Sequence, residues 1–391
     1  MRVVAVGTGG AAGWPEPGCR CASCHRQLMD DKARGQSTIV VDDVLRLGDG
    51  GDAAGTAGEE AAGTARGEAG TAGADSPGYW VRRVADARVP GGLGGWDVTG
   101  PDGGRLLSAA GPGAVPVPPE GTAGYDVALL DLLGEPAQLG LLRERGLITS
   151  GTLTAVAFAD HRVVSEAELR RRCGFWGVAL LRDGDAVTTD RSEEKCLWPK
   201  VRGPWRVLVL GGARSGKSEQ AELRLAGEPD VTYVATGPSG DAGPAADLEW
   251  TARVAAHRAR RPAWWRTVET TDLAGVLLAT SGAVLIDGIG TWLAAVMDEC
   301  GAWDGLAAEA AATLAERVAG LVGAWRQTGA HVVAVSDETG LGVVPGTRAG
   351  RLFRDELGRL NQMLAAESEE TELVVAGRIL PLAPGGNGPL P

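Results

Sequence analysis

Phenylalanine, tyrosine and lysine are scarce in this 391-residue chain, which has three Phe, three Tyr and four Lys. It contains no run of 18 apolar residues, so the sequence predicts no membrane-spanning helix. The apolar run at the N-terminus is short and ends in glycine, unlike an export signal. The formal charge of −12 argues against general nucleic-acid binding, which needs a basic face. We therefore expect a cytoplasmic protein.

Cysteine is also infrequent, with six residues, but three of them cluster as C-x-C-x-x-C at Cys19, Cys21 and Cys24. Clustered thiols in a long chain without an export signal are typical of a metal site or of free thiols, rather than of disulfides. Two alternatives stay open. The three residues are reduced thiols in a turn, or they bind a structural Zn²⁺ with His25 or a distant cysteine as the fourth ligand.

The length of the chain favours two domains, each long enough to bury a core. Residues 50–75 are mostly Gly, Ala, Thr and Glu, which cannot offset the entropy of ordering, so we expect a disordered insertion there. A linker is expected at 198–204. The predicted domains are therefore residues 1–200 and 203–391.

The second domain alternates short apolar runs with helical patterns. Strands are expected at Val207–Leu210, Val231–Ala235, Ala283–Ile286, Val332–Val335 and Leu373–Ala376. Helices are expected at Ser218–Ala226, Leu248–Arg260, Leu306–Trp325 and Arg351–Ala366. This alternation predicts an α/β fold with a parallel sheet covered by helices on both faces.

A phosphate-binding P-loop opens the second domain and fits G-x-x-x-x-G-K-[ST]. Its residues are Gly211, Gly212, Ala213, Arg214, Ser215, Gly216, Lys217 and Ser218. A strand precedes the motif and a helix follows it, which is the context that the motif requires. Lys217 is expected to reach the β- and γ-phosphates and Ser218 to bind Mg²⁺, so the domain binds and consumes a nucleoside triphosphate. The alternative is a chance glycine-rich turn.

A carboxylate at the end of a neighbouring strand is expected to hold Mg²⁺ or its water ligands. Asp287 follows the apolar run Ala283–Ile286 and meets this requirement. The alternative is an ordinary strand-ending aspartate before Gly288.

The P-loop, Tyr233–Gly237, Arg253–Glu269, Asp287–Leu293 and Asp337–Gln362 together resemble the bifunctional adenosylcobinamide kinase / adenosylcobinamide-phosphate guanylyltransferase family. The resemblance covers roughly the last 185 residues. It implies phosphorylation of adenosylcobinamide with ATP or GTP, then transfer of GMP from GTP through an enzyme–GMP intermediate. It also implies a corrinoid partner and a trimer.

The same resemblance places the guanylylated nucleophile at His257. A neutral imidazole can attack an α-phosphate and leave again, and neighbouring arginines disfavour its protonation. Without the resemblance, an exposed histidine on an arginine-rich helix end is the more ordinary interpretation. The expected nucleotide-binding residues outside the P-loop are Ala235, Thr236, Gly237, Arg258, Ala259, Arg260, Arg261, Glu269 and Asp287.

The chain departs from the family pattern at three positions. Asp337 stands where the family commonly has Asn, Gly288 where Cys is frequent, and Gly237 where Ser is frequent. None removes a group that the chemistry needs, although Asp337 is expected to alter nucleotide or corrinoid affinity.

The first domain resembles the metallo-β-lactamase fold in Gly7–Cys24 and in the segment that begins at Asp160-His161. The H-x-H-x-D-H metal motif of that fold is absent, and only His25 and His161 occur in this half. The resemblance therefore implies a degenerate domain without hydrolytic activity.

Two other functions remain open on the sequence alone. One is a P-loop kinase that carries out only the phosphorylation, for which His257 would be dispensable. The other is a nucleotide-binding switch or scaffold that transfers nothing to a corrinoid.

Overall fold

The computed structural model describes residues 1–30, 32–48, 54–55, 78–190, 204–237, 255, 258–303 and 307–383. The chain divides into two compact units, Met1–Val201 and Arg202–Pro391. The expected disordered insertion at 50–75 lies outside the described residues apart from the short strand Ala54–Gly55. Most of the expected linker lies outside them as well.

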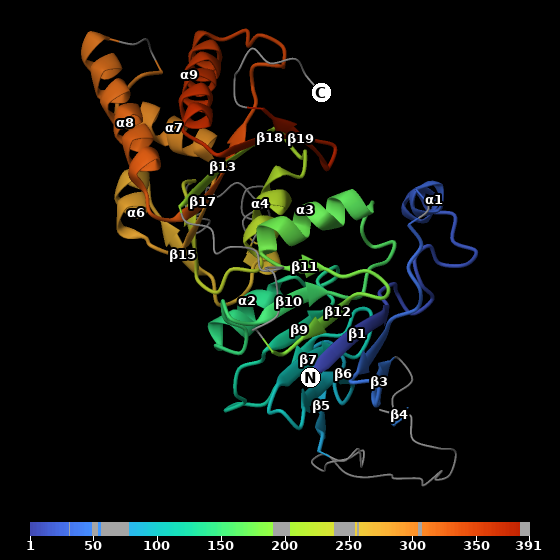
Figure 1. Ribbon diagram of the computed structural model, residues 1–391. Helices are drawn as coiled ribbons and strands as arrows, with labels where there is room; N and C mark the ends of the chain where they lie inside the picture. The colour runs from blue at the N-terminus through green and yellow to red at the C-terminus, as the bar shows by residue number, and fades with distance from the viewer. Residues whose placement is uncertain are drawn as a thin grey trace. The chain divides into compact units, whose positions relative to one another are not determined.

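The second unit is built on a seven-stranded sheet with the order β15-β14-β16-β17-β13-β18-β19 (Figure 1). Its strands are β13 (Trp205–Gly211), β14 (Val231–Ala235), β15 (Arg266–Glu269), β16 (Ala283–Asp287), β17 (His331–Asp337), β18 (Glu370–Val375) and β19 (Arg378–Leu382). All neighbouring strands pair in parallel except β19, which pairs antiparallel with β18. The parallel α/β fold predicted for this half is confirmed.

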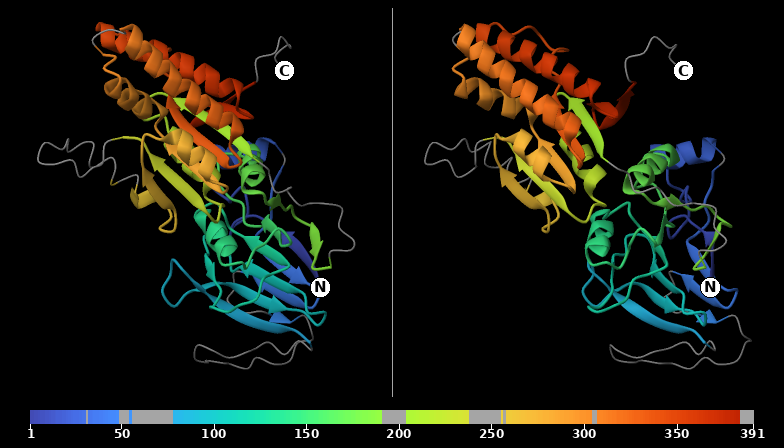
Figure 2. Two further views of the ribbon diagram at one scale, coloured as in Figure 1. Left: turned by 90° about the vertical axis from the view of Figure 1, so that its left-hand side faces the viewer. Right: turned by 60° about the vertical axis from the view of Figure 1, so that its left-hand side comes forward.

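Helices cover both faces of this sheet because successive strand residues point to opposite sides. The helices are α4 (Lys217–Leu225), α6 (Leu273–Ala279), α7 (Ile289–Glu299), α8 (Ala308–Gln327) and α9 (Arg348–Ala366). Leu208 and Leu210 of β13 face a core shared with α6 to α9, whereas Val207 and Val209 face a core shared with α4. Figure 2 shows α8 and α9 running alongside each other on the first of these faces.

The first unit packs two sheets face to face. One has the order β12-β1-β2-β3-β4, with β1 (Arg2–Gly7), β2 (Thr38–Val41), β3 (Leu45–Gly48), β4 (Ala54–Gly55) and β12 (Ala186–Thr188). The other has the order β11-β10-β9-β7-β6-β5-β8, with β5 (Trp80–Asp86), β6 (Leu93–Thr99), β7 (Arg105–Ala109), β8 (Pro116–Val117), β9 (Val127–Leu130), β10 (Leu153–Val156) and β11 (Ala179–Leu180). One apolar core joins Val3 and Ile39 of the first sheet to Val98 and Leu129 of the second.

Among the described residues of this unit, three helices complete the fold, α1 (Ala22–Met29), α2 (Ala137–Glu144) and α3 (Glu166–Trp176). Helix α3 begins directly after Ser165, whose side chain accepts a hydrogen bond from the Glu168 backbone N–H. No helix among the described residues is long and apolar enough to cross a membrane.

Candidate active site in the second unit

The functional residues of the second unit gather at the carboxyl edge of its parallel sheet. Strand register pairs Gly211 with Asp337, and Ala235 with both Glu269 and Asp287. The carboxyl ends of parallel strands meet at one edge, which is where open α/β sheets bind ligands. Residues far apart in sequence are therefore brought to one site by register alone.

The P-loop occupies the turn between β13 and α4, and its backbone has the conformation of a phosphate-binding loop. Gly216 has φ 97° and Arg214 has φ 57°, both in the left-handed region. A Cβ atom at Gly211 would lie 2.5 Å from the Ser215 hydroxyl, so only glycine fits there. The helix begins at Lys217, and its N-terminus therefore points towards the loop.

Lys217 is almost completely buried, at 7% exposed. Its ammonium group lies 2.8 Å from the Asp337 carboxylate and donates to the Gly212 carbonyl oxygen at 3.1 Å. The Asp337 side chain is 44% exposed, so the pair opens towards solvent on the carboxylate side. A bound triphosphate therefore meets an ammonium that already has an anionic neighbour.

Each oxygen of the Asp287 carboxylate accepts a hydrogen bond from a hydroxyl group. The Ser218 hydroxyl donates to Oδ1 at 3.1 Å, and the Tyr233 hydroxyl donates to Oδ2 at 2.7 Å. A serine hydroxyl beside a carboxylate is a pair of hard oxygen donors, the type that Mg²⁺ prefers. The two residues predicted to hold the metal are thus brought together, and their chemistry fits it.

The turn after β14 is tied to the turn after β16 by hydroxyl groups. The Thr236 hydroxyl donates to the Gly288 carbonyl oxygen at 2.7 Å and lies 2.6 Å from the Thr291 hydroxyl. Gly288 has φ 123°, and a Cβ atom there would lie 2.2 Å from the Thr291 hydroxyl oxygen. In this chain, therefore, the glycine that replaces the family's frequent cysteine is required by its own surroundings. Ala235 and Gly237 lie on either side of Thr236.

The arginine-rich segment predicted to carry guanylylation is described from Arg258 onward, and His257 lies outside the described residues. Arg258 pairs with Glu269 at 3.1 Å, and Arg260 pairs with Glu222 of α4 at 3.1 Å. The Arg261 guanidinium carbon lies 3.6 Å from the centre of the Tyr233 ring. Ala259 is exposed between these side chains. The segment is thus anchored on α4, β14 and β15.

Comparison with known proteins matches this unit to one family. The sequence model described as "Cobinamide kinase / cobinamide phosphate guanyltransferase" matches residues 207–382. The bifunctional adenosylcobalamin biosynthesis protein CobU of Salmonella typhimurium is 39% identical over 181 residues, which are 44% of this chain and 96% of that protein. This chain belongs to that family. The CobU protein of Escherichia coli is 37% identical over 181 residues, again 44% of this chain and 96% of that protein.

A third relative in the family is the bifunctional adenosylcobalamin biosynthesis protein CobP of Pseudomonas aeruginosa. It is 42% identical over 185 residues, which are 45% of this chain and 96% of that protein. The predicted family and its class, an enzyme, are therefore confirmed. The residues that match the family model all lie within the second unit.

Two contacts of this site were not anticipated from the sequence. Tyr233 was noted only as part of a motif, although its hydroxyl reaches Asp287 across the pair of strands β14 and β16. Asp337 was noted as a departure from the family, but not as the partner of Lys217. Both contacts depend on strand order, which places β14 beside β16 and β17 beside β13 and which spacing in the sequence does not reveal.

A cysteine and histidine cluster in the first unit

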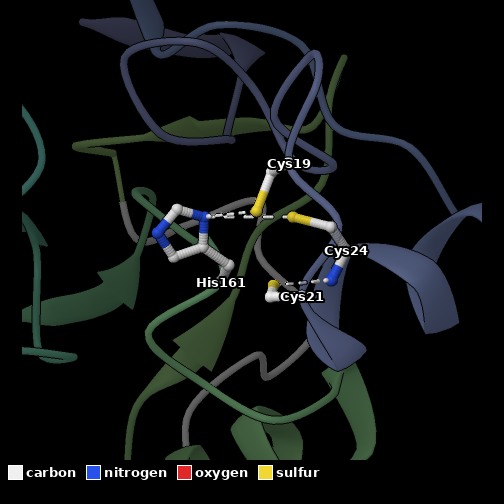
Figure 3. A group of neighbouring side chains, drawn as sticks. All are labelled: Cys19, Cys21, Cys24 and His161. Atoms are coloured by element: carbon white, nitrogen blue, oxygen red, sulfur yellow. Dashed lines mark hydrogen bonds between the residues drawn. The ribbon is translucent and has the colours of Figure 1, made fainter.

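The three clustered cysteines lie around His161 (Figure 3). One ligand atom from each of the four residues lies within 4.8 Å of every other. The Sγ atoms of Cys19 and Cys24 lie 3.8 Å and 3.9 Å from His161 Nδ1. The ligand atoms of a tetrahedral Zn²⁺ site lie roughly 3.5 Å apart, given bond lengths of about 2.0–2.3 Å. The cluster therefore approaches the arrangement of a Cys₃His site.

The fourth member of the cluster, His161, is neither His25 nor a distant cysteine, the two candidates for a fourth ligand. His25 is an exposed residue of α1. The histidine that lies beside the three thiols is His161, from the segment between β10 and α3. The local spacing of Cys24 and His25 made the neighbour the obvious choice. Long-range packing decides otherwise, since the Ser23 hydroxyl of α1 donates to the Val163 carbonyl oxygen at 2.6 Å and so holds the two segments together.

The thiols of this cluster differ in their environments. A hydrogen bond from the Cys24 backbone N–H lowers the pKa of the Cys21 thiol. Burial raises the pKa of the Cys24 thiol to about 12. Without a cation, the buried Cys24 therefore stays protonated at neutral pH.

A second polar cluster lies where β9 and β10 end. The Arg162 guanidinium contacts the Asp131 carboxylate at 2.7 Å and the Asp160 carboxylate at 2.8 Å. Burial disfavours the charged guanidinium, but hydrogen bonds and Coulomb attraction from both carboxylates outweigh this and raise the pKa of Arg162. The charged side chain of Arg162 thus lies between the carboxylates of Asp131 and Asp160.

Proposed function

We propose that the second unit phosphorylates the hydroxyl of adenosylcobinamide and then transfers GMP from GTP to the phosphate it has made. Family membership carries this proposal, because the relatives named as bifunctional cobalamin biosynthesis proteins match over 96% of their length. The P-loop, with Ser218 beside Asp287, supports it as a triphosphate site.

In the first step the acceptor hydroxyl attacks the γ-phosphorus, and the bond from that phosphorus to the β–γ bridging oxygen breaks. Lys217 and the N–H groups of the loop bind the phosphates and stabilise charge on the departing nucleotide. Ser218 and Asp287 would hold Mg²⁺, which neutralises phosphate charge. The serine and aspartate oxygens are already 3.1 Å apart, so these donors need no rearrangement of the backbone.

In the second step a nitrogen of His257 attacks the α-phosphorus of GTP, and pyrophosphate leaves. The corrinoid phosphate oxygen then attacks the same phosphorus and breaks its bond to the histidine nitrogen, which regenerates the imidazole. Arg258, Arg260 and Arg261 follow this residue directly and supply positive charge for the phosphates. Glu269 is proposed to accept from guanine N1–H and N2–H.

The two steps are tested with two labels. With γ-labelled ATP or GTP and cobinamide, the account expects labelled corrinoid phosphate. With α-labelled GTP alone, it expects label on the protein that survives base and is released by acid, as a phosphoramidate is. Phosphorylated corrinoid without protein label would favour a kinase that performs only the first transfer. Nucleotide binding with neither product would favour a switch or scaffold.

For the first unit we propose that Cys19, Cys21, Cys24 and His161 bind a structural Zn²⁺. Three soft thiolates and one imidazole form a donor set that zinc prefers, and a site filled by four protein ligands is structural rather than catalytic. The His161 Nδ1 atom also lies 3.0 Å from a Glu16 carboxylate oxygen. A bound cation would lower the thiol pKa values and convert Cys24 to a ligand.

We also propose that this unit is a degenerate member of the metallo-β-lactamase fold with no hydrolytic activity. The ion pairs of Arg162 with Asp131 and Asp160 support this, since they engage strand-end carboxylates that a hydrolytic metal would otherwise need. A guanidinium stays charged at neutral pH and does not leave like a bound ion.

A further inference from the structure

Tyr233 is a buried residue of β14, only 5% exposed, on the sheet face that packs against α4. Its ring lies in an apolar core with Leu285 and Val333, which phenylalanine would fill equally well. The hydroxyl group is therefore the informative part. A buried hydroxyl costs free energy unless it is hydrogen-bonded, and this one donates to Asp287 Oδ2 at 2.7 Å.

The hydrogen bonds from Ser218 and Tyr233 to Asp287 are expected to respond differently when a triphosphate and Mg²⁺ bind. Ser218 is expected to turn its oxygen to the metal, so its hydrogen bond to Oδ1 is exchangeable. Tyr233 approaches Oδ2 from within the core and has no such second role. The tyrosine bond, which metal binding does not displace, can then help to keep the carboxylate plane fixed.

We propose that Tyr233 is a positioning residue, which holds the Asp287 carboxylate in the orientation that receives Mg²⁺ for both transfers. This inference rests on the proposed function of the second unit. It assigns to the tyrosine hydroxyl a role that operates through Asp287, without contact to the substrate.

The ring of Tyr233 extends this role to the guanylylation segment. The Arg261 guanidinium stacks 3.6 Å from the ring centre, an arrangement in which a cation is attracted to the face of an aromatic ring. Residue 261 is four positions from the proposed nucleophile, and Arg260 is tied to Glu222 of α4. One tyrosine thus contacts the metal-binding carboxylate through its hydroxyl and anchors the guanylylation segment through its face.

The test compares Tyr233→Phe with the wild-type chain in equilibrium binding of a fluorescent, non-hydrolysable GTP analogue at increasing Mg²⁺. We expect the half-saturating Mg²⁺ concentration to rise about tenfold, which corresponds to the loss of one hydrogen bond to a charged group, about 1.4 kcal/mol. Binding of the analogue without Mg²⁺ should be unchanged. Mn²⁺ resonance spectra of the same complexes report the metal site directly and should show weaker Mn²⁺ binding.

Tyr79→Phe is the matched control, because the Tyr79 hydroxyl also donates to an aspartate, Asp42, but in the first unit. It should leave the Mg²⁺ dependence unchanged. A folded Tyr233→Phe protein with wild-type Mg²⁺ dependence would overturn the proposal and leave the tyrosine as a packing residue. This binding measurement needs neither a corrinoid nor a transfer reaction. Failure of the proposed function would instead appear as the absence of transfer products with the wild-type protein, so the two failures can be distinguished.

Arg261 is tested separately through the protein-bound GMP label. Arg261→Met keeps much of the side-chain length but removes the cation from the Tyr233 ring. We expect it to reduce the rate of labelling several-fold while the Mg²⁺ dependence of analogue binding stays within twofold. Labelling at the wild-type rate would refute the anchoring role.

Discussion

At the scale of single residues, the contact between Lys217 and Asp337 makes the P-loop of this chain unusual. The ammonium that should bind phosphate already has a carboxylate 2.8 Å away. Two anions then compete for one cation. Because Asp337 is 44% exposed, solvent screens the pair and its contribution is modest.

We predict that Asp337→Asn binds a GTP analogue about two- to fivefold more tightly, since a partly exposed pair is worth up to about 1 kcal/mol. Calorimetric titration at fixed Mg²⁺ measures the change. Asp355→Asn, which alters an exposed carboxylate of α9, is the control and should bind as the wild type does. Weaker binding by Asp337→Asn would mean that the carboxylate assists the nucleotide.

A second prediction concerns Glu166 of the first unit, a carboxylate surrounded by arginines. It pairs with the buried Arg34 at 3.3 Å and with Arg182 at 2.7 Å. Burial alone would raise the carboxyl pKa, but these guanidinium groups outweigh it and lower the pKa of Glu166 below its usual 4.5. A carboxyl group whose pKa is lowered by folding stabilises the fold at pH values above its ordinary pKa. This stability is lost as the pH falls through the lowered pKa.

Glu166→Gln should therefore lower the free energy of unfolding at neutral pH by about 3 kcal/mol, because it removes the carboxylate that pairs directly with the buried Arg34 charge. The loss relative to wild type should shrink as the pH falls below the ordinary carboxyl pKa of 4.5, and it should vanish only below the lowered pKa of Glu166, where the wild-type carboxylate is itself protonated. Urea unfolding at several pH values measures both effects. Glu356→Gln, from an exposed pair on α9, should cost less than about 1 kcal/mol. Equal losses at all pH values would contradict the ion-pair explanation.

At the scale of elements, sequence patterns predicted the strands and helices whose apolar side chains are buried. The five apolar runs are β13, β14, β16, β17 and β18, and the predicted helix Arg351–Ala366 is most of α9. Strand β15 was missed because its side chains are mostly exposed and carry no apolar pattern, as expected of an edge strand. Helix α7 was missed because Gly288 and Gly290 stand at its start, which follows Asp287 without a side-chain cap.

The same contrast holds for the sites. The P-loop was readable because one continuous segment supplies all of its motif residues. The partners that strand order supplies, Tyr233 and Asp337, were not, since neither lies near the P-loop in sequence. The Cys₃His cluster shows both cases. Its thiols were evident from spacing, whereas His161 is brought in by packing 137 residues from Cys24.

The cluster makes a prediction for α1 and the loop before it. The purified protein should contain about one Zn²⁺ per chain, and a chelator should lower the melting temperature of the first unit. Elemental analysis and thermal unfolding measure these quantities. His161→Ala should lose the metal, and His25→Ala, the matched control, should keep it. A metal content near zero in protein purified without chelator would contradict the site.

At the scale of the whole molecule, the chain joins two units that each bury an apolar core of their own. The family match and the phosphate-binding edge belong to the second unit. We therefore propose that both transfers belong to residues 203–391 and that the first unit holds a structural metal and has no hydrolytic activity. The transfers and the structural metal are both tested with the full chain.

The most direct test of the central claim is a label-and-chase measurement with α-labelled GTP. The wild-type protein should take up acid-labile label, and adding corrinoid phosphate should move that label to the corrinoid. His257→Ala should take up no label. The control is His331→Ala, which should be labelled as the wild type is; His331 is the first residue of β17, and its ring lies 3.4 Å from the Glu228 carboxylate. Label that persists in His257→Ala, or that the corrinoid phosphate does not remove, would contradict the account.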